Sequence, residues 1–391
     1  MADQLKVPFF KPSFGSEEEA AVLDVLKSGW LTTGKEALAF EKEFAERIGV
    51  PYALAVNSNT SGMILAMEAC GVCPGKAVIT TPYTFVSTAT SARHLGADVY
   101  FADIESDTYS IDPESIEKIL KSDKGKQVAA IVPVHIAGNV CNMKAICAIA
   151  KKYNVKVIED CAHSFPSQTK DGYAGALGDI GVFSFYVTKT ITTGEGGMVT
   201  TKDEALAKRM TVMRMHGMDR TTWDRYTSPR ASWEYDIIAP GFKFNLPDLL
   251  AALGRIQLKR ADEFDQKRKV HASYYNKAFS KLDFVTLPPD SEGNAWHLYP
   301  LRLNLEKLNC DRNTFAKELQ QEGIGISMHF IPLFHFTYWT QLYKDFTKEA
   351  FPHAEKQYLR TISLPLWPDM TQQMCDTVVE AVTRIGEAHH V

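Results

Sequence analysis

Short apolar runs alternate with amphipathic stretches through the first two hundred residues of the chain. The runs are rich in β-branched and aromatic residues, and the stretches between them repeat apolar positions at helical spacing. Strands are predicted at 52–56, 78–80, 99–103, 128–134, 155–159, 182–187 and 198–201. Helices are predicted at 16–28, 36–48, 86–95, 113–122, 143–153 and 203–215, with another ending at Ala69. This alternation predicts βαβ units and a mostly parallel sheet, that is, an α/β fold.

The pattern of apolar and polar positions changes after residue 215. Residues 216–240 form a polar stretch rich in arginine and aromatic residues, without periodicity, and we expect a functional or interfacial loop. Further helices are predicted at 247–261, 270–282, 314–322 and 371–386, with strands at 298–303 and 324–329. This part is interpreted as a smaller α+β domain. At the other end of the chain, Ser16 and Glu19 are expected to form a capping box at the start of the first helix.

Composition narrows the class of protein. The chain has 391 residues, 45% of them hydrophobic and 23% charged, and a net charge of −4, which gives no support for nucleic acid or an anionic membrane as partner. No apolar run reaches the ~18 residues of a membrane span, and the N-terminal residues lack a signal-peptide core. Seven scattered cysteines indicate reduced thiols in a cytoplasm, and the lone pair Cys70 and Cys73 is not expected to bind metal.

The lysine at position 189 stands between an apolar strand and the glycine-rich loop 194–197. Glycines there let the backbone approach a ligand. A nucleophilic lysine needs such a site, because desolvation lowers its pKa and frees the amine for a Schiff base. The alternative interpretation is a solvated charge at a strand end. This stretch alone does not decide between the two.

Two polar groups follow other predicted strands. Asp160 ends the strand 155–159, and a carboxylate buried there should meet a cation or a strong donor, such as a protonated heterocyclic nitrogen. Alternatively, it caps a following helix. The run Asn57–Gly62, which includes Thr60 and Ser61, opens a helix whose N–H groups suit a phosphate, although an ordinary polar N-cap has the same composition.

An aromatic ring and a hydroxyl complete the set. Phe85 lies in a Pro-Tyr-Thr-Phe turn, where it would lie flat against a planar cofactor or pack in the core. Ser184 alternates with Phe183 and Phe185, so it faces the other side of its strand. A lysine, a strand-end aspartate, a helix-terminal hydroxyl cluster and a stacking ring are together what a pyridoxal-phosphate site requires.

The chain resembles the nucleotide-sugar aminotransferases of the DegT/StrS type, within the fold-type I pyridoxal-phosphate enzymes. The motifs that carry the resemblance run in family order over nearly the whole chain. They are Gly29-Trp-Leu-Thr-Thr-Gly34, Asn59-Thr-Ser-Gly62, Tyr83-Thr-Phe85, Glu159-Asp-Cys-Ala-His163, Gly178-Asp-Ile-Gly-Val-Phe-Ser-Phe185, Thr188-Lys189, Thr193-Gly-Glu-Gly-Gly197 and Gly241-Phe-Lys-Phe-Asn245. The resemblance implies a large pyridoxal-phosphate-binding domain at 1–250, with an N-terminal helix arm, and a small α+β domain at 251–391.

The resemblance also implies roles for individual residues. Lys189 would bind the cofactor and shuttle a proton, Asp160 would pair with the pyridine nitrogen, and His163 would lie beside the ring. The remaining cofactor contacts would be Thr60, Ser61 and Ser184 at the phosphate, Phe85 on the ring, and Asn245 from the neighbouring subunit of a homodimer with shared sites. Many family members have Asn-Tyr-Arg where this chain has Lys243-Phe-Asn245. The candidate sugar-nucleotide contacts are Trp30, Thr32, His329 and Arg230.

The implied reaction moves an amino group from L-glutamate to a 3- or 4-keto group of a nucleotide-linked hexose, in the synthesis of surface polysaccharide, lipopolysaccharide or a similar glycoconjugate. Relatives that dehydrate sugars carry histidine in place of Lys189, so transamination is favoured over dehydration. A fold-type I enzyme acting on amino acids remains an alternative. A non-enzymatic scaffold is disfavoured, because every cofactor position is filled by a competent residue.

Overall fold

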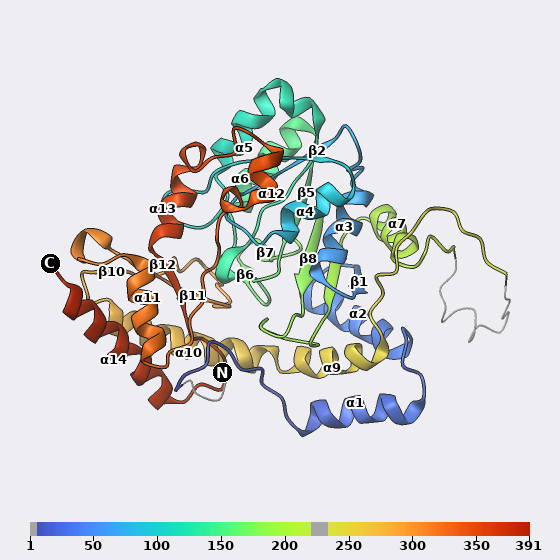
Figure 1. Ribbon diagram of the computed structural model, residues 1–391. Helices are drawn as coiled ribbons and strands as arrows, with labels where there is room; N and C mark the ends of the chain where they lie inside the picture. Colours follow the sequence, from blue (N-terminus) through green and yellow to red (C-terminus); the bar gives the residue numbers. More distant parts are fainter. Residues whose placement is uncertain (1–5, 220–233) are drawn as a thin grey trace.

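A seven-stranded sheet with helices on both faces forms the larger part of the molecule, seen in a computed structural model that describes residues 6–219 and 234–391 (Figure 1). The strand order is β1-β9-β8-β5-β4-β2-β3, and only β9 is antiparallel to its neighbours. The strands are β1 (Tyr52–Val56), β2 (Ala77–Thr80), β3 (Asp98–Phe101), β4 (Val128–Ile131), β5 (Lys156–Asp160), β8 (Ile180–Ser184) and β9 (Gly197–Thr201). The predicted mostly parallel α/β sheet is confirmed.

The pleat of the strands sends neighbouring side chains to opposite faces of this sheet. In β8, Val182 packs into the core beneath α3, whereas Phe183 packs into a second core beneath α2. The helices over the first face are α3 (Asn59–Ala69), α4 (Ser87–His94) and α7 (Glu204–Arg214). Those over the second face are α2 (Lys35–Ile48), α5 (Pro113–Lys121) and α6 (Met143–Tyr153). Both faces are therefore buried, as a mostly parallel sheet requires.

A second, antiparallel sheet of three strands lies in the C-terminal part of the chain (Figure 1). It consists of β10 (Val285–Thr286), β11 (Tyr299–Leu303) and β12 (Thr361–Leu364), and it shares a core with α10 (Ala261–Phe279), α11 (Arg312–Gln321) and α14 (Gln372–His389). The small α+β unit is thus present, whereas its predicted boundary at residues 250 and 251 stays a prediction.

The segment 333–354 does not belong to this second core. Leu333, Trp339 and Phe346 are buried in the same cluster as the strands of the large sheet. Phe346 stacks on Phe101 of β3 with ring centroids 4.1 Å apart and an angle of 22° between the planes. The segment carries α12 (Thr337–Leu342) and continues into α13 (Pro352–Arg360), neither of which was predicted. The chain therefore returns to the first core between β11 and β12 of the second sheet.

Two long helices run along one side of the molecule, α1 (Ser16–Ser28) and α9 (Asp248–Lys259) (Figure 1). The buried carboxylate of Asp248 accepts backbone N–H groups from Gly34 (2.6 Å), Ala37 (3.0 Å) and Glu36 (3.2 Å). It satisfies donors that the first turn of α2 leaves without intrahelical partners. This contact ties the start of α9 to the start of α2. The structure also holds two hairpin strands, β6 (Gln168–Thr169) and β7 (Gly172–Tyr173), and short 3₁₀ turns η2 (Asp123–Gln127), η3 (Ile136–Gly138), η4 (Leu305–Lys307), η5 (Leu333–His335) and η6 (Lys348–Ala350).

Several predicted boundaries are wrong. The strand expected at 182–187 ends at Ser184, because the carbonyl of Phe185 accepts the N–H of Thr193 instead of continuing the β8–β9 register, and the N–H of Lys189 then closes a turn onto the carbonyl of Tyr186. The strand expected at 324–329 makes only two isolated bridges, at Ile324 and at Ser327. The helix expected at 270–282 begins nine residues earlier, at Ala261, and ends at Phe279. These differences arise from tertiary contacts that local patterns do not contain.

The first helix starts differently from the prediction. Gly15 is its N-cap, and its N–H donates to the Glu18 carboxylate at 2.9 Å, so Ser16 and Glu19 do not form the capping box. Glu18 also pairs with Arg260, whose Nη1 lies 2.8 Å from Oε1 of Glu18.

Among the described residues, no helix is long and apolar enough to cross a membrane.

Candidate active site

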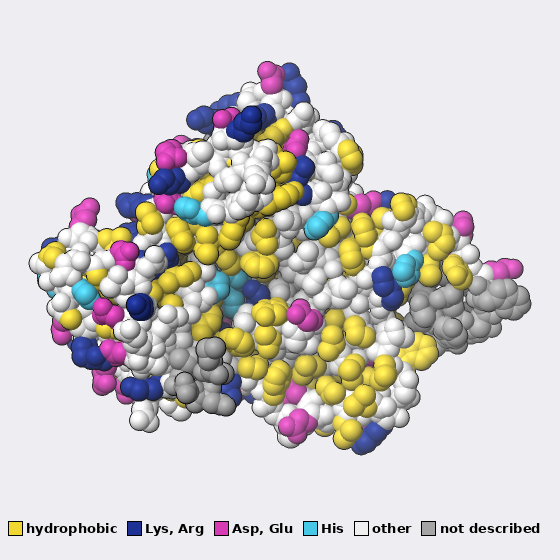
Figure 2. Space-filling model, viewed as in Figure 1, with side chains coloured by type: hydrophobic (Ala, Val, Ile, Leu, Met, Phe, Trp, Pro, Cys, Tyr) yellow, Lys and Arg dark blue, Asp and Glu magenta, His cyan; other side chains and the backbone are white. Residues whose placement is uncertain are grey.

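A cavity of about 440 Å³ opens where strands of the large sheet end against the second sheet. Its walls include residues that follow β1, β2, β5 and β8, together with His297, His329 and Phe330 from the C-terminal part. Histidine and basic side chains lie at the floor of a hollow in the middle of the face shown in Figure 2. Ligands of open α/β sheets bind beyond the carboxyl ends of the strands, and this cavity has that position.

Lys189 enters this cavity from the turn that follows β8. Its backbone N–H donates to the carbonyl of Tyr186 at 2.9 Å, which closes the turn. Burial lowers the pKa of Lys189 to about 8, against the opposing effect of the Asp160 carboxylate. A substantial fraction of the amine is therefore neutral in mildly alkaline solution, which is the form that attacks a carbonyl carbon.

Asp160 lies at the end of β5 on the same cavity. Its Oδ2 accepts a hydrogen bond from the Thr88 hydroxyl at 2.7 Å, and its Oδ1 accepts from the Ala162 N–H at 3.2 Å and from Asn59 at 3.4 Å. Burial raises the pKa of Asp160, while these donors and Lys189 act in the opposite direction. No helix begins directly after Asp160, so the alternative interpretation as an N-cap is wrong.

The start of α3 borders the cavity, and its hydroxyl groups differ in direction. Thr60 lines the cavity, together with Ser184 from the far side of β8. Ser61 does not line it, because its hydroxyl donates to Asn57 at 2.5 Å and lies 2.9 Å from the Ser58 hydroxyl. Ser58 is the N-cap and accepts the N–H of Ser61 at 3.1 Å. Of the two predicted hydroxyls, only Thr60 faces the cavity.

The aromatic and imidazole rings surround the remaining space. Phe85 is 59% exposed although it is a large apolar side chain, and its ring lies 6.3 Å from that of Phe330. It lines the cavity rather than the core, which decides between the two interpretations of this residue. The ring of His163 stacks on Phe330 at 5.4 Å, and His329 lies 6.2 Å from His163.

Both of these histidines are held in defined orientations. The N–H of Ala137 donates to Nδ1 of His163 at 3.3 Å, so a neutral His163 carries its proton on Nε2. Nδ1 of His329 lies 3.0 Å from the Ser363 hydroxyl. Burial, followed by the charge of Lys189, lowers the pKa of His163 well below its ordinary value and that of His329 to about 3. Both rings are therefore neutral at physiological pH.

Several cavity residues were not predicted. Phe9 and Phe10 reach the cavity from the N-terminal segment, and Phe9 stacks on His329 at 5.7 Å. His297 precedes β11, its ring lies 4.5 Å from His163, and its buried Nδ1 has no hydrogen-bond partner within the part of the chain that the structure describes. A histidine directly before an apolar strand was the available signal for His297. Nothing in the local sequence marks the two phenylalanines.

Other predicted site residues lie elsewhere in the chain's own fold. Trp30, Thr32 and Asn245 do not line this cavity. They gather where α2 and α9 begin: the Trp30 indole N–H donates to the Thr33 carbonyl at 3.3 Å, and the Asn245 amide donates to the Thr33 hydroxyl at 2.6 Å. Arg230 falls outside the described residues.

Fold and cavity together define a pyridoxal-phosphate enzyme of the fold-type I aminotransferase class. The sequence profile of the DegT/DnrJ/EryC1/StrS aminotransferase family matches residues 12–383, and the chain belongs to this family. The resemblance stated from the motifs is thereby confirmed.

Similar proteins include a polysaccharide biosynthesis protein, an aminotransferase and a putative sugar aminotransferase. The chain is 42% identical over 382 residues to the spore coat polysaccharide biosynthesis protein SpsC of Bacillus subtilis, covering 97% of each chain. Helicobacter pylori PseC, an aminotransferase involved in the biosynthesis of pseudoaminic acid, aligns with a TM-score of 0.89 and 30% identity over 98% of this chain and 99% of its own. The putative sugar aminotransferase Spr1654 of Streptococcus pneumoniae aligns with a TM-score of 0.90 and 28% identity over 98% of this chain and 100% of its own.

The residues present fit the cofactor of this family. Asp160 is only 3% exposed, and no salt bridge neutralises its carboxylate within residues 6–219 and 234–391. A protonated ring nitrogen would supply the missing cation. The N-terminus of α3, with Thr60 beside it, provides N–H groups for a phosphate, and Lys189 provides the amine.

The lowered pKa of Lys189 predicts how cofactor-free protein takes up pyridoxal phosphate. Because only the neutral amine attacks the aldehyde, the rate constant of attachment should rise about tenfold per pH unit up to pH ~8 and level off above it. An unperturbed lysine would show the same rise up to pH ~10.4. Stopped-flow absorbance after mixing measures this rate. A rate that keeps climbing steeply above pH ~9 would show that burial does not lower this pKa.

Proposed function

We propose that this chain transfers an amino group from L-glutamate to a 3- or 4-keto group of a nucleotide-linked hexose. The observation that carries the proposal is the cavity in which Lys189 and Asp160 face a common space lined by neutral histidines. The names of SpsC and PseC, a polysaccharide protein and an aminotransferase of sugar biosynthesis, support a place in the synthesis of surface polysaccharide or a similar glycoconjugate.

Five residues that line the cavity have proposed roles. Bound pyridoxal phosphate supplies an aldehyde that carries nitrogen and a ring that accepts electrons. Lys189 holds the cofactor and moves a proton, and the Asp160 carboxylate keeps the ring nitrogen protonated. Thr60, Ser184 and the start of α3 bind the phosphate. Phe85 covers the ring, which also excludes water from it.

The proposed active form is a homodimer in which Asn245 serves the partner's site. Asn245 lies outside the cavity of its own chain, next to the start of α9. Large apolar side chains are exposed nearby, among them Leu26 (50%) and Leu38 (44%), and hydrophobic side chains gather over α1 and α9 in Figure 2. An exposed apolar surface of this kind is typical of a protein interface. A monomer at micromolar concentration in sedimentation equilibrium would contradict this arrangement.

The function is tested by following both halves of the reaction. Glutamate should bleach the visible absorbance of the cofactor-loaded protein with release of 2-oxoglutarate. A panel of 3- and 4-keto nucleotide sugars should then restore it, with an amino sugar nucleotide as product detected by mass spectrometry. Turnover of free amino and keto acids alone would instead favour an amino-acid-directed enzyme. Release of water from a sugar without glutamate would favour a dehydratase.

A further inference from the structure

A second buried carboxylate, Glu159, directly precedes Asp160 in β5 and lies on the opposite face of the sheet. Its side chain is fully buried. Oε1 accepts the N–H groups of Leu177 (2.8 Å) and Gly178 (2.7 Å), and Oε2 accepts that of Gly175 (2.9 Å). These three donors come from the loop that leads into β8. Glu159 therefore fixes the approach of β8 while its neighbour Asp160 faces the cavity.

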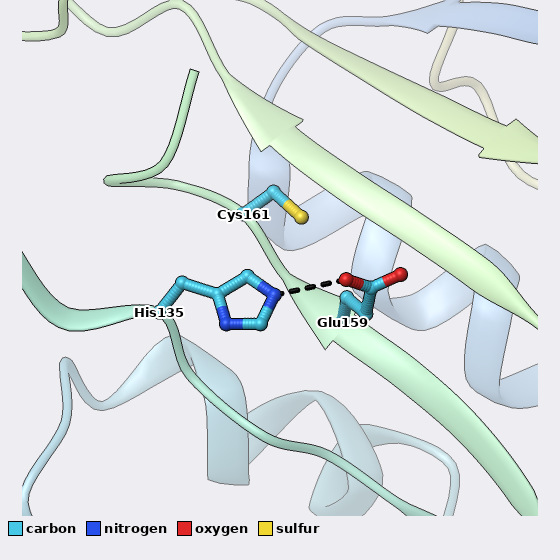
Figure 3. A group of neighbouring side chains, drawn as sticks. All are labelled: His135, Glu159 and Cys161. Carbon is cyan, nitrogen blue, oxygen red and sulfur yellow. Dashed lines mark hydrogen bonds and ion pairs between the residues drawn. The ribbon is translucent and has the colours of Figure 1, made fainter. Parts of the chain in front are cut away.

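The fourth partner of Glu159 is an imidazole (Figure 3). Nε2 of His135 lies 2.9 Å from Oε2 of Glu159, and both side chains are fully buried. The N–H of Cys141 donates to Nδ1 of His135 at 3.2 Å, so the ring carries a proton on Nε2 and donates it to the carboxylate. Both nitrogens of this ring and both oxygens of Glu159 are satisfied.

The thiol of Cys161 lies beside His135 and Glu159, and all three side chains are of types that can bind a metal. Their potential ligand atoms lie within 4.8 Å of one another. A cation there would have to displace the Nε2 proton of His135 from Glu159, and the Glu159 oxygens already accept three backbone N–H groups. Burial raises the pKa of Cys161 to about 11, which keeps the thiol protonated. The geometry thus favours a hydrogen-bonded pair over a metal site.

The backbone around His135 connects this pair to the cavity on the other face. The N–H of His135 donates to the carbonyl of Asp160 at 3.1 Å, and the N–H of Asp160 donates to the carbonyl of Pro133 at 2.8 Å. His135 is followed by the turn η3, in which the N–H of Ala137 donates to Nδ1 of His163. The ring of His135 is fixed by Glu159 and Cys141, and the backbone of the same residue holds Asp160 and leads directly to the N–H that fixes the His163 tautomer.

We propose that His135 and Glu159 are positioning residues for the amino-transfer reaction. The pair holds Asp160 and the Ala137 N–H in place, and so fixes the tautomer of His163 with its proton on Nε2. The groups around His163 are the rings of His297 and His329 and the charge of Lys189. The proposal rests on the proposed function for its kinetic consequences. It assigns no contact with substrate to either residue.

The test compares two substitutions of His135. His135→Phe keeps an aromatic ring but removes the hydrogen bonds of the imidazole to Glu159 and Cys141, whereas the amide of His135→Gln can still donate to Glu159. We expect His135→Phe to lower kcat about tenfold to a hundredfold with KM for glutamate changed less than about threefold. The pH profile of kcat should gain an acidic limb below the pH of ~6.5 at which a free imidazole titrates, because Nδ1 of His163 loses its donor while burial and the charge of Lys189 still oppose protonation. His135→Gln should restore most of kcat. His335→Phe removes a matched, solvent-exposed histidine–glutamate pair, His335 with Glu355, and should change nothing.

A second readout uses the cofactor-free protein and does not depend on activity. With ¹⁵N-labelled histidine, the His163 signal, assigned by its loss in His163→Asn, should show a single Nε2–H tautomer in the native chain and a mixture in His135→Phe. An unchanged tautomer together with an unchanged pH profile would overturn the proposal. A loss of kcat that tracks only a lowered Tm would also overturn it, because that is a purely structural effect. If no ketosugar is aminated, the proposed function fails while the tautomer measurement still decides this inference.

Discussion

Replacing Lys189 with alanine should remove both the visible absorbance of the bound cofactor and amino transfer. The amine is the only candidate for covalent attachment among the described cavity residues, since no other lysine lines that space. Loss of attachment and of proton transfer together should lower kcat at least about a thousandfold. Absorbance of the purified protein and single-turnover bleaching by glutamate measure the two effects separately.

Two controls make this result interpretable. Lys208→Ala removes an exposed lysine that pairs with Glu204 on α7, and it should leave absorbance and turnover unchanged. Adding a small primary amine to Lys189→Ala should return part of the activity, because a free amine can replace the missing proton carrier. If Lys189→Ala keeps more than about a tenth of native kcat, the assigned role is wrong.

Replacing Asp160 with asparagine should slow the reaction while leaving the cofactor attached. The amide oxygen can still accept the Ala162 N–H, and the Thr88 hydroxyl can rotate to accept a hydrogen bond from the amide nitrogen, so the local fold is kept, but the negative charge that would face the ring nitrogen is lost. Breaking a buried charge pair costs about 3–5 kcal/mol, which corresponds to a decrease of roughly a hundredfold to several thousandfold in kcat. Rapid-mixing absorbance with saturating glutamate measures this step.

Asp203 provides a control, because it is an aspartate that caps a helix outside the cavity. Asp203 caps α7 through the N–H groups of Ala205 (2.8 Å) and Leu206 (3.2 Å), and Asp203→Asn should leave kcat unchanged. In Asp160→Asn the pKa of Lys189 should also fall further, because the Asp160 carboxylate is the group that raises it. Equal rates for native protein and Asp160→Asn would remove the ring-nitrogen role.

The sequence located the parts of the site that follow strands of the large sheet. Asp160, Lys189 and Ser184 were predictable because a polar residue after a buried strand reaches the carboxyl edge of the sheet. Ser61 does not line the cavity, since its side chain turns into the cap of its own helix, and a local pattern cannot tell the two directions apart. His297 comes from more than a hundred residues further along the chain, and only the tertiary fold brings it to His163.

The fold was predicted best where patterns are local. Alternating Ile324, Ile326 and Met328 imitate a strand, but among the described residues this segment forms β-bridges only with Val7 and Ser363. The start of α10 was not predicted, because residues 261–269 are mostly charged and show no apolar face in the sequence. The face that this stretch buries, which includes Phe264 and Arg268, becomes visible only in the structure. Patterns report which residues prefer to be buried, whereas contacts decide where an element begins and ends.

The return of segment 333–354 to the core of the large sheet has a consequence for how the chain holds together. Because Trp339 and Phe346 complete a core whose strands end before residue 202, the first two hundred residues alone lack part of their own interior. The two sheets are therefore not independent modules that could be exchanged between proteins by cutting near residue 250. Their stabilities are linked, and the chain is expected to behave as one cooperative unit when it unfolds.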